Sequence, residues 1–121
     1  GDEPALWVRD ATGRVTAWIE VGAPDATRLH YGSKLADRTV VYTHRDPQKV
    51  LGGWKGKSIY RADDIVLRSF DPGFVEAAAG ALERRSVMTV SVTEGHVYLE
   101  LNGTTLSSGI HEHSIGEAIR P

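Results

Sequence analysis

The sequence has no cysteine among its 121 residues. This absence excludes disulfide frameworks, thiol nucleophiles, iron–sulfur clusters and zinc sites built on thiolates. The sequence also lacks any apolar run near the roughly 18 residues that span a bilayer, and no signal-peptide pattern opens it. We therefore expect a protein of the reducing cytoplasm that has no membrane partner.

An excess of one charge is absent as well. Lysine and arginine number 14 and aspartate and glutamate 16, so the formal net charge is −2. This balance excludes a domain that holds nucleic acid mainly by its overall charge, although a local basic patch remains open. With 40% hydrophobic and 25% charged residues, the composition is that of an ordinary globular protein, and the length predicts a single domain over residues 1–121.

The first half of the chain predicts a hairpin followed by a strand–helix–strand unit. Segments rich in β-branched and aromatic residues flank the turn signal Asp10–Gly13, so they pair as antiparallel strands. A helix follows and then a short apolar strand, which together indicate a parallel crossover. The expected elements are the strands Ala5–Arg9 and Val15–Val21, the helix Pro24–Ala36 and the strand Arg38–Thr43.

The second half predicts one strand, one helix and a β-meander. Asp71 is expected to cap the helix, and Glu94-Gly95 and Asn102-Gly103 lie where tight hairpin turns belong. The segment 46–57 is ambiguous, because a helix-start signal precedes several glycines. The expected elements are the strand Ile65–Phe70, the helix Asp71–Arg85, the strands Ser86–Thr93, His96–Leu101 and Thr104–Ser107, and a partly ordered tail over 109–121. The fold class is thus α/β, an α+β mixed sheet that ends in a C-terminal antiparallel β-meander.

Glu20 is the first candidate for chemistry. It lies near the carboxyl end of a strand that is followed by a helix, which is where α/β sheets tend to place functional groups. If Trp7 pairs with Trp18, the antiparallel register brings Ala5 opposite Glu20 and Arg9 opposite Thr16. A purely structural alternative is a carboxylate that pairs with Arg9, Arg28 or a backbone N–H.

The hairpin and the following helix start carry a resemblance. The segments are Glu3-Pro4-Ala5-Leu6-Trp7 and Ala17–Asp25 (AWIEVGAPD), with Arg28 and Val40–Thr43. Together with the strand–turn–strand segment Val87–Leu101, they resemble the bacterial YaeQ family from about Gly1 to about Leu101. The resemblance implies that this chain lacks the family's N-terminal part, which fits a chain that begins at Gly1 without an initiator methionine.

The resemblance also implies a fold. YaeQ proteins are similar to the PD-(D/E)XK nucleases, so it implies a restriction-endonuclease-like core, in which acidic residues hold Mg²⁺ or Mn²⁺ and activate water for phosphodiester hydrolysis. Pro4 matches the motif's proline and Glu20 matches the acid of its second half. Ala5 stands where the motif has its first acid, and Gly22 stands where it has its lysine.

An active site would therefore need substitutes. Glu3 would serve beside Glu20 as the second metal ligand, and Lys34 would replace the motif's lysine as a catalytic residue beside Glu20. The helix positions of Lys34, His30 and Tyr31 favour instead an outward face.

The helix Pro24–Ala36 carries a small basic and aromatic cluster. Its members are Arg28, His30, Tyr31 and Lys34, with Arg38 nearby. Such a cluster would contact phosphates and stack on bases, while the alternative is a solvated helix face beside acidic neighbours.

His111-Glu112-His113 has the composition of a metal clip. In an extended chain the two histidines point the same way, although the sequence offers no third ligand nearby. Metal binding by this segment is thus left open.

Three functions remain. The first is a YaeQ-like protein of nuclease-related fold with a degraded metal site and a non-catalytic or regulatory binding role. The second is a nuclease that depends on Mg²⁺ or Mn²⁺, and the third is a purely protein-binding module. Because one sheet face would lack its cover, we expect an exposed apolar patch that a second copy or another chain fills.

Overall fold

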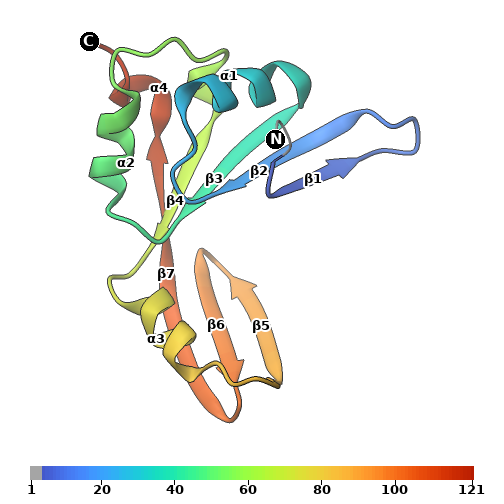
Figure 1. Cartoon of the computed structure of the whole chain (residues 1–121), viewed down its shortest axis with the longest axis vertical. Helices are drawn as coiled ribbons and strands as arrows, with labels where there is room; N and C mark the ends of the chain where they lie inside the picture. The colour runs from blue at the N-terminus through green and yellow to red at the C-terminus, as the bar shows by residue number, and fades with distance from the viewer. Residues whose placement is uncertain (1–3) are drawn as a thin grey trace. The chain divides into compact units, whose positions relative to one another are not determined.

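The structure is a computed structural model that describes residues 4–121. The chain forms two compact units (Figure 1). The first contains the residues up to Ser69 together with Glu112–Pro121, and the second is Phe70–His111. The fold is a mixed α+β fold, as the sequence predicts.

The first unit is built on a sheet with antiparallel and parallel pairs. β1 pairs with β2 antiparallel, and β2–β3 and β3–β4 are parallel, which confirms the predicted hairpin and crossover. The strand bounds are β1 Leu6–Arg9, β2 Val15–Val21, β3 Arg38–Thr43 and β4 Val66–Phe70, and β7, Thr104–Ser114, follows β4 in the sheet order.

The hairpin register is the predicted one except at its turn end. Trp7 pairs with Trp18, and their rings meet edge-to-face with centroids 6.2 Å apart. The register shifts between Val8 and Arg9, so Arg9 lies opposite Val15 and not opposite Thr16. The prediction for Arg9 is therefore wrong, because a bulge adds a residue to one strand that alternation alone does not show.

Helix α1 (Ala26–Leu35) packs on this sheet through its small residues. The Asp25 carboxylate caps it by accepting the Arg28 backbone N–H at 2.8 Å. Leu29, Gly32 and Ser33 are its buried residues. A Cβ on Gly32 would lie 2.6 Å from Cε2 of Trp18, so only glycine lets the helix approach this closely.

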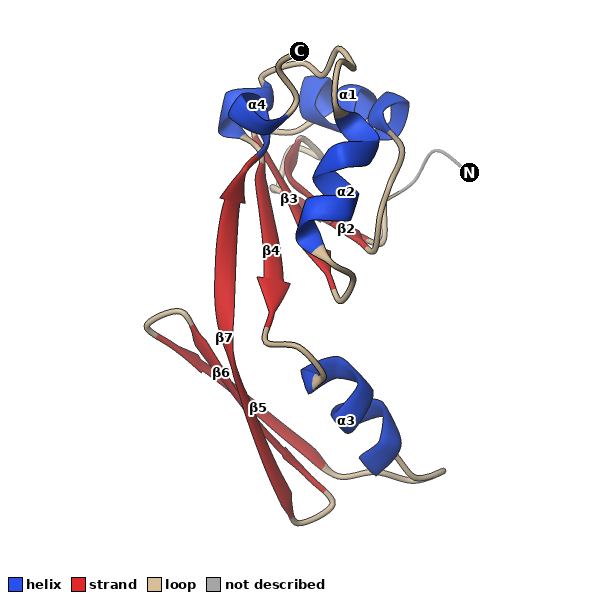
Figure 2. Ribbon diagram, turned by 90° about the vertical axis from the view of Figure 1, so that its left-hand side faces the viewer, coloured by secondary structure: helices blue, strands red, loops and turns tan. Residues whose placement is uncertain are grey.

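The ambiguous segment folds as helix α2 (Pro47–Trp54). The Asp46 carboxylate caps it by accepting the Gln48 N–H at 2.9 Å, and its glycines face solvent. A short 3₁₀ helix, Ala62–Asp64, precedes β4. The apolar side of α2 joins α1, β3, β4 and α4 (Ile115–Ala118) in one core, and Figure 2 shows the three helices gathered around it. This core consists of Leu29, Val41, Val50, Leu51, Trp54, Ile59, Ile65, Leu67, Ile115 and Ile119.

The expectation of a partly ordered tail over 109–121 is wrong. β7 continues to Ser114 and helix α4 follows it directly. Ile115 is fully buried and Ile119 is 8% exposed. Two isoleucines four residues apart anchor this end, which is too short a pattern for periodicity to identify it.

The second unit contains α3 (Phe74–Ala81), β5 (Met88–Thr93), β6 (His96–Leu101) and the first part of β7. β5, β6 and β7 pair antiparallel in succession, which confirms the predicted meander. Both central residues of each turn have positive φ, with Asn102 at 50° and Gly103 at 82°. This is the conformation for which Asn-Gly is favoured in tight hairpins.

Asp71 does not cap the helix of this unit. Helix α3 begins at Phe74 after Gly73, whose φ is 83°, and it ends at Ala81 and not at Arg85. The Asp71 carboxylate contacts the His111 Nε2 at 2.7 Å and accepts the Gly109 N–H at 3.2 Å. The hydrogen bond from His111 and then that from Gly109 hold the pKa of Asp71 below its usual range.

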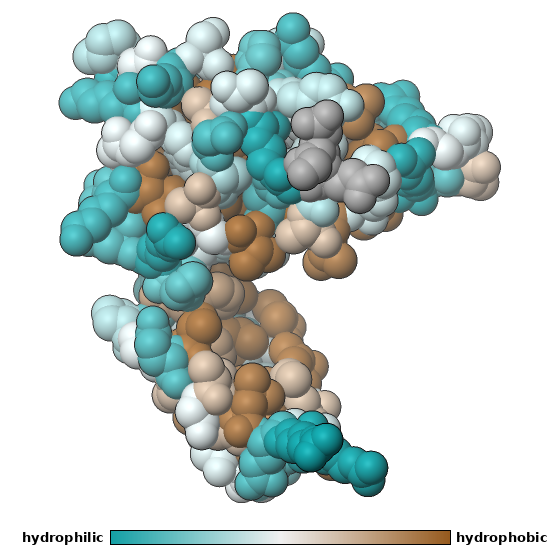
Figure 3. Space-filling model, viewed as in Figure 1, coloured by the Kyte–Doolittle hydropathy of each residue, from teal (hydrophilic) through white to brown (hydrophobic). Residues whose placement is uncertain are grey.

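Both units expose large apolar side chains. Leu6 and Val8 of β1 are exposed in the first unit, and every residue of β5 is exposed in the second. Figure 3 shows apolar residues gathered over the second unit. That a second copy or another chain covers these residues stays a prediction. Within residues 4–121, no helix combines the length and the apolar character needed to cross a membrane.

The close contact of Gly32 with Trp18 yields a stability prediction. Gly32→Ala should lower the free energy of unfolding by about 1–3 kcal/mol, because the added methyl collides with a rigid, fully buried indole. Tryptophan fluorescence during urea unfolding measures this change in the first unit, which holds all three tryptophans.

Gly52→Ala is the matched control, because Gly52 lies in α2 and nothing is within 4 Å of the place that an added Cβ would take. It should leave stability unchanged or raise it by up to about 1 kcal/mol. Equal effects of the two substitutions would contradict the packing described here.

Candidate functional site

The candidate site lies at the carboxyl end of β2. Alternation along the strand puts Glu20 on the same side as Trp18, toward α1. The Glu20 residue is only 2% exposed. A carboxylate buried to this degree needs compensating charge and hydrogen bonds, because burial disfavours its ionised form.

Two groups compensate Glu20. Its Oε2 forms an ion pair with Nε of Arg28, in the first turn of α1. Its Oε1 accepts the backbone N–H of Ala5 at 3.3 Å. Both oxygens of the carboxylate are thus engaged within the chain. This is the structural arrangement that the sequence offered as the alternative to a metal ligand.

The turn between β2 and α1 brings this pair together. Gly22 directly follows the strand with φ of 101°, and its N–H donates to the Tyr42 carbonyl at 2.8 Å. A side chain at this position would be strained in that conformation. The chain then enters α1 within three residues, so Arg28 lies beside the end of the strand it has just left.

Among residues 4–121, the groups that contact the Glu20 carboxylate are two N–H donors, those of Arg28 and Ala5, and this set does not fit a Mg²⁺ or Mn²⁺ ion. Mg²⁺ takes about six oxygen ligands, usually one or two carboxylates together with several waters, whereas both oxygens of Glu20 already have partners within the chain. Across the described residues, no group of three or more histidine, aspartate and glutamate side chains converges to hold a metal. Glu3, the expected second ligand, lies outside the described residues. We therefore derive no metal-dependent step here.

Lys34, the expected catalytic lysine, lies in the last turn of α1 and is exposed. Its Nζ lies 5.9 Å from the centre of the Tyr60 ring. Six residues separate it from Arg28, which is a rotation of about 240° around the helix axis. The structure therefore does not bring Lys34 and Glu20 together.

The expected basic and aromatic cluster is split between two sides of α1. Arg28 binds Glu20, and the exposed Tyr31 ring packs edge-to-face on Trp18 with centroids 5.7 Å apart. His30 lies with Lys34, and its Nδ1 accepts the Tyr60 backbone N–H at 2.9 Å. The four residues thus form no single surface.

Tyr60 and Arg61 are neighbours of this cluster that the sequence did not point to. The Arg61 guanidinium lies 5.5 Å from the centre of the Tyr60 ring. It donates to the carbonyls of Ser33 and Ala36 at 3.2 and 2.8 Å, which satisfies the end of α1. In the sequence, Tyr60 and Arg61 form a short aromatic and basic pair soon after the ambiguous segment 46–57. No local pattern indicates that this pair contacts a helix about 30 residues earlier.

The segment His111-Glu112-His113 is extended, and each side chain has a different partner. His111 contacts Asp71, Glu112 accepts from Arg68 at 2.9 Å, and the His113 Nε2 lies 3.0 Å from the Ser69 Oγ. Metal binding by this segment stays an open hypothesis.

A family model and two solved structures point to the same protein family. A family model described as "YaeQ protein" matches residues 1–109. Two crystal structures are similar, those of YaeQ proteins from Xanthomonas axonopodis pv. citri (23% identity, TM-score 0.77) and Pseudomonas syringae (26% identity, TM-score 0.76). This chain is covered over 93% and 92% of its length, and it spans 64% and 62% of theirs, less than two thirds. No curated protein matches the chain.

The burial of Glu20 predicts the effect of removing its partner. Arg28→Gln should lower the free energy of unfolding by about 3 kcal/mol, because it leaves a buried carboxylate without its counter-ion. Urea unfolding followed by tryptophan fluorescence measures the loss.

Arg14→Gln is the control, because it removes the partner of Asp37 in a pair whose side chains are 66% and 45% exposed. An exposed pair of this kind contributes at most about 1 kcal/mol. If Arg28→Gln cost no more than Arg14→Gln, the buried pair would not have the role assigned to it.

Proposed function

The chain belongs to the YaeQ family, and on that premise we propose that it is a non-catalytic binding module of nuclease-related fold whose metal site is degraded. The observation that carries the proposal is the engagement of both Glu20 carboxylate oxygens, one by Arg28 and one by the Ala5 N–H. A carboxylate held in this way has an internal counter-ion in place of a metal. The role that follows is to bind, and not to cleave.

The two departures from the nuclease motif support this proposal. Ala5 has no carboxylate to offer as a second metal ligand, and its backbone N–H donates to Glu20. Gly22 has φ of 101°, a conformation in which a lysine side chain is strained. Each position thus carries a feature that serves the hairpin and the turn. Neither provides the motif's chemistry.

The exposed hairpin supports a binding role with a polypeptide partner, either a second copy or another chain. Trp7 is 38% exposed and the guanidinium of Arg9 lies 4.1 Å from the centre of its ring. Leu6 and Val8 are 61% and 50% exposed on the same strand. Tryptophan and arginine are among the residues that carry most of the binding energy at protein interfaces, and Leu6 and Val8 add apolar surface beside them. Residence in the cytoplasm belongs to the same proposal.

Calorimetric titration of Mn²⁺ and Mg²⁺ tests the proposal, together with cleavage assays on single- and double-stranded DNA. We expect no saturable binding in the wild type, the same isotherms in Glu20→Gln, and no cleavage by either protein. The physical reason is that a metal would have to displace Arg28 from a nearly buried carboxylate.

Glu100→Gln, an exposed substitution in the second unit, controls for the loss of one negative charge. Saturable binding that disappears in Glu20→Gln and persists in Glu100→Gln would overturn the proposal and favour the metal-dependent nuclease.

A further inference from the structure

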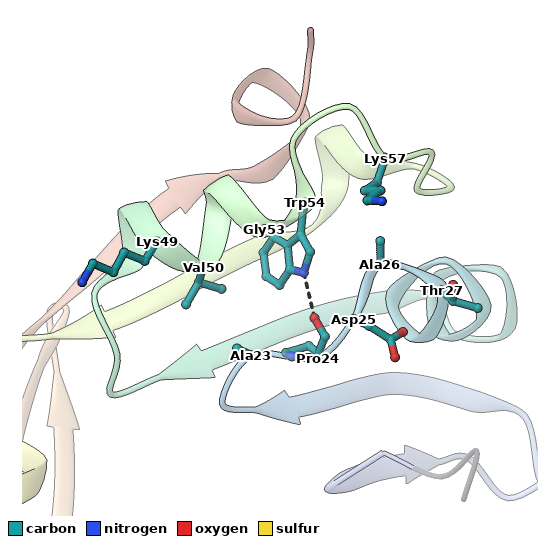
Figure 4. Close-up of a pocket in the computed structure, with 10 residues that line it drawn as sticks. All are labelled: Ala23, Pro24, Asp25, Ala26, Thr27, Lys49, Val50, Gly53, Trp54 and Lys57. Carbon is teal, nitrogen blue, oxygen red and sulfur yellow. Dashed lines mark hydrogen bonds between the residues drawn. The ribbon is translucent and has the colours of Figure 1, made fainter.

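A cavity of about 350 Å³ lies in the first unit, away from Glu20. Figure 4 shows it between the segment that leads into α1 and the helix α2. Its volume is within the usual range for small-molecule sites, about 300–1,000 Å³. The residues that matter for its chemistry are Pro24, Asp25, Lys49, Val50, Trp54 and Lys57.

The apolar wall of this cavity is fixed in place. The Trp54 Nε1–H donates to the Pro24 carbonyl at 2.7 Å, which ties α2 to the segment before α1. Trp54 is 3% and Val50 6% exposed, and both belong to the core of the unit. The cavity is therefore present before any ligand arrives, and little conformational freedom is lost on binding.

The charged side chains that line this cavity differ in whether they already have a partner. Lys49 and Lys57 are exposed, and neither ammonium group has an acidic partner in the described residues. The single acidic side chain of the lining, Asp25, accepts the Arg28 backbone N–H at 2.8 Å and so is committed to capping α1. In Figure 4, Lys57 lies above Ala26, whereas the Asp25 carboxylate lies below Ala26 and points away from the indole ring.

We propose that this cavity binds a phosphate monoester, with the phosphate at Lys57 and the organic part against Pro24 and Ala26, the partly exposed apolar residues of the lining. Lysine is a common point-charge ligand of phosphate, and an apolar wall suits the base and sugar of a nucleotide. Lys49, at the other end of α2, offers a second cation to a longer ligand. This site is separate from Glu20 and goes beyond the binding role proposed above.

Two kinds of molecule carry such a phosphate monoester, a free nucleoside monophosphate and the 5′-phosphorylated end of a nucleic-acid strand. Nuclear magnetic resonance titration separates them, because the Trp54 indole N–H reports on the cavity wall directly. The probes are inorganic phosphate, AMP, adenosine, and a short single-stranded oligonucleotide with and without a 5′-phosphate. The proteins are the full chain and the variants Lys57→Gln and Lys55→Gln.

We expect AMP to shift the Trp54 indole resonance saturably and adenosine to leave it unmoved. Lys57→Gln should weaken AMP binding about tenfold, a loss typical of a charge-assisted contact. Lys55→Gln is the matched control, because Lys55 is exposed beside the same helix end and does not line the cavity. Tighter binding of the phosphorylated oligonucleotide than of AMP would identify the strand end as the source.

Two results would overturn the proposal. One is the absence of a saturable shift with AMP and with the phosphorylated oligonucleotide. The other is an equal weakening by Lys57→Gln and Lys55→Gln, which would mean that general electrostatic attraction explains the binding. An unchanged indole resonance in the free variants confirms that the substitutions leave the cavity wall intact.

Discussion

A carboxylate buried as deeply as that of Glu20 needs a compensating charge and hydrogen bonds, and helix α1 supplies the compensating cation. Arg28 supplies the cation from the first turn of the helix. One turn later, Gly32 lies against the Trp18 indole. The helix and the strand therefore contact each other at two points, Arg28 on Glu20 and Gly32 on Trp18.

The distance between these two contacts is nearly the same along the helix as along the strand. Four residues of α-helix rise about 6 Å, and two residues of β-strand rise about 6.6 Å. Because the helix runs back along β2, the spacing from Arg28 to Gly32 matches that from Glu20 to Trp18. The ion pair and the glycine contact thus set one register between α1 and the sheet. The core between α1, α2 and α4 builds on that register.

In the function proposed above, the Glu20–Arg28 pair is what distinguishes this chain from the metal-dependent nucleases that its sequence resembles. The motif's acid is present as Glu20, but its charge stabilises the helix packing. Under that proposal, the ion pair with Arg28, the Ala5 N–H donor and the backbone conformation of Gly22 give Glu20 a structural role in place of a metal-binding one. Binding functions then have to be sought elsewhere, on the exposed β1 strand and at the cavity beside Trp54.

Local signals in the sequence predict much of this fold. The hairpin, the Trp7–Trp18 pair and the Asn102-Gly103 turn follow from alternation and turn chemistry, and the structure confirms them. The sequence leaves the partner of Glu20 open between Arg9, Arg28 and a backbone N–H. A separation of eight residues does not determine the direction in which the Arg28 side chain points. Contacts between distant residues were missed. Asp71 stands where a helix cap is expected, but its carboxylate contacts His111, which lies 40 residues later in the sequence. Ile115 and Ile119 place the last helix in the core, and two isoleucines are too brief a pattern to distinguish a helix from a tail.

A double-mutant cycle on Glu20 and Arg28 tests the central claim most directly. The free energies of unfolding of the wild type, Glu20→Gln, Arg28→Gln and the double variant give the coupling energy of the pair. We predict a coupling above about 1 kcal/mol, as expected for residues in direct contact and out of water. Effects that add to within about 0.5 kcal/mol would show that the two side chains act independently, and would contradict the account.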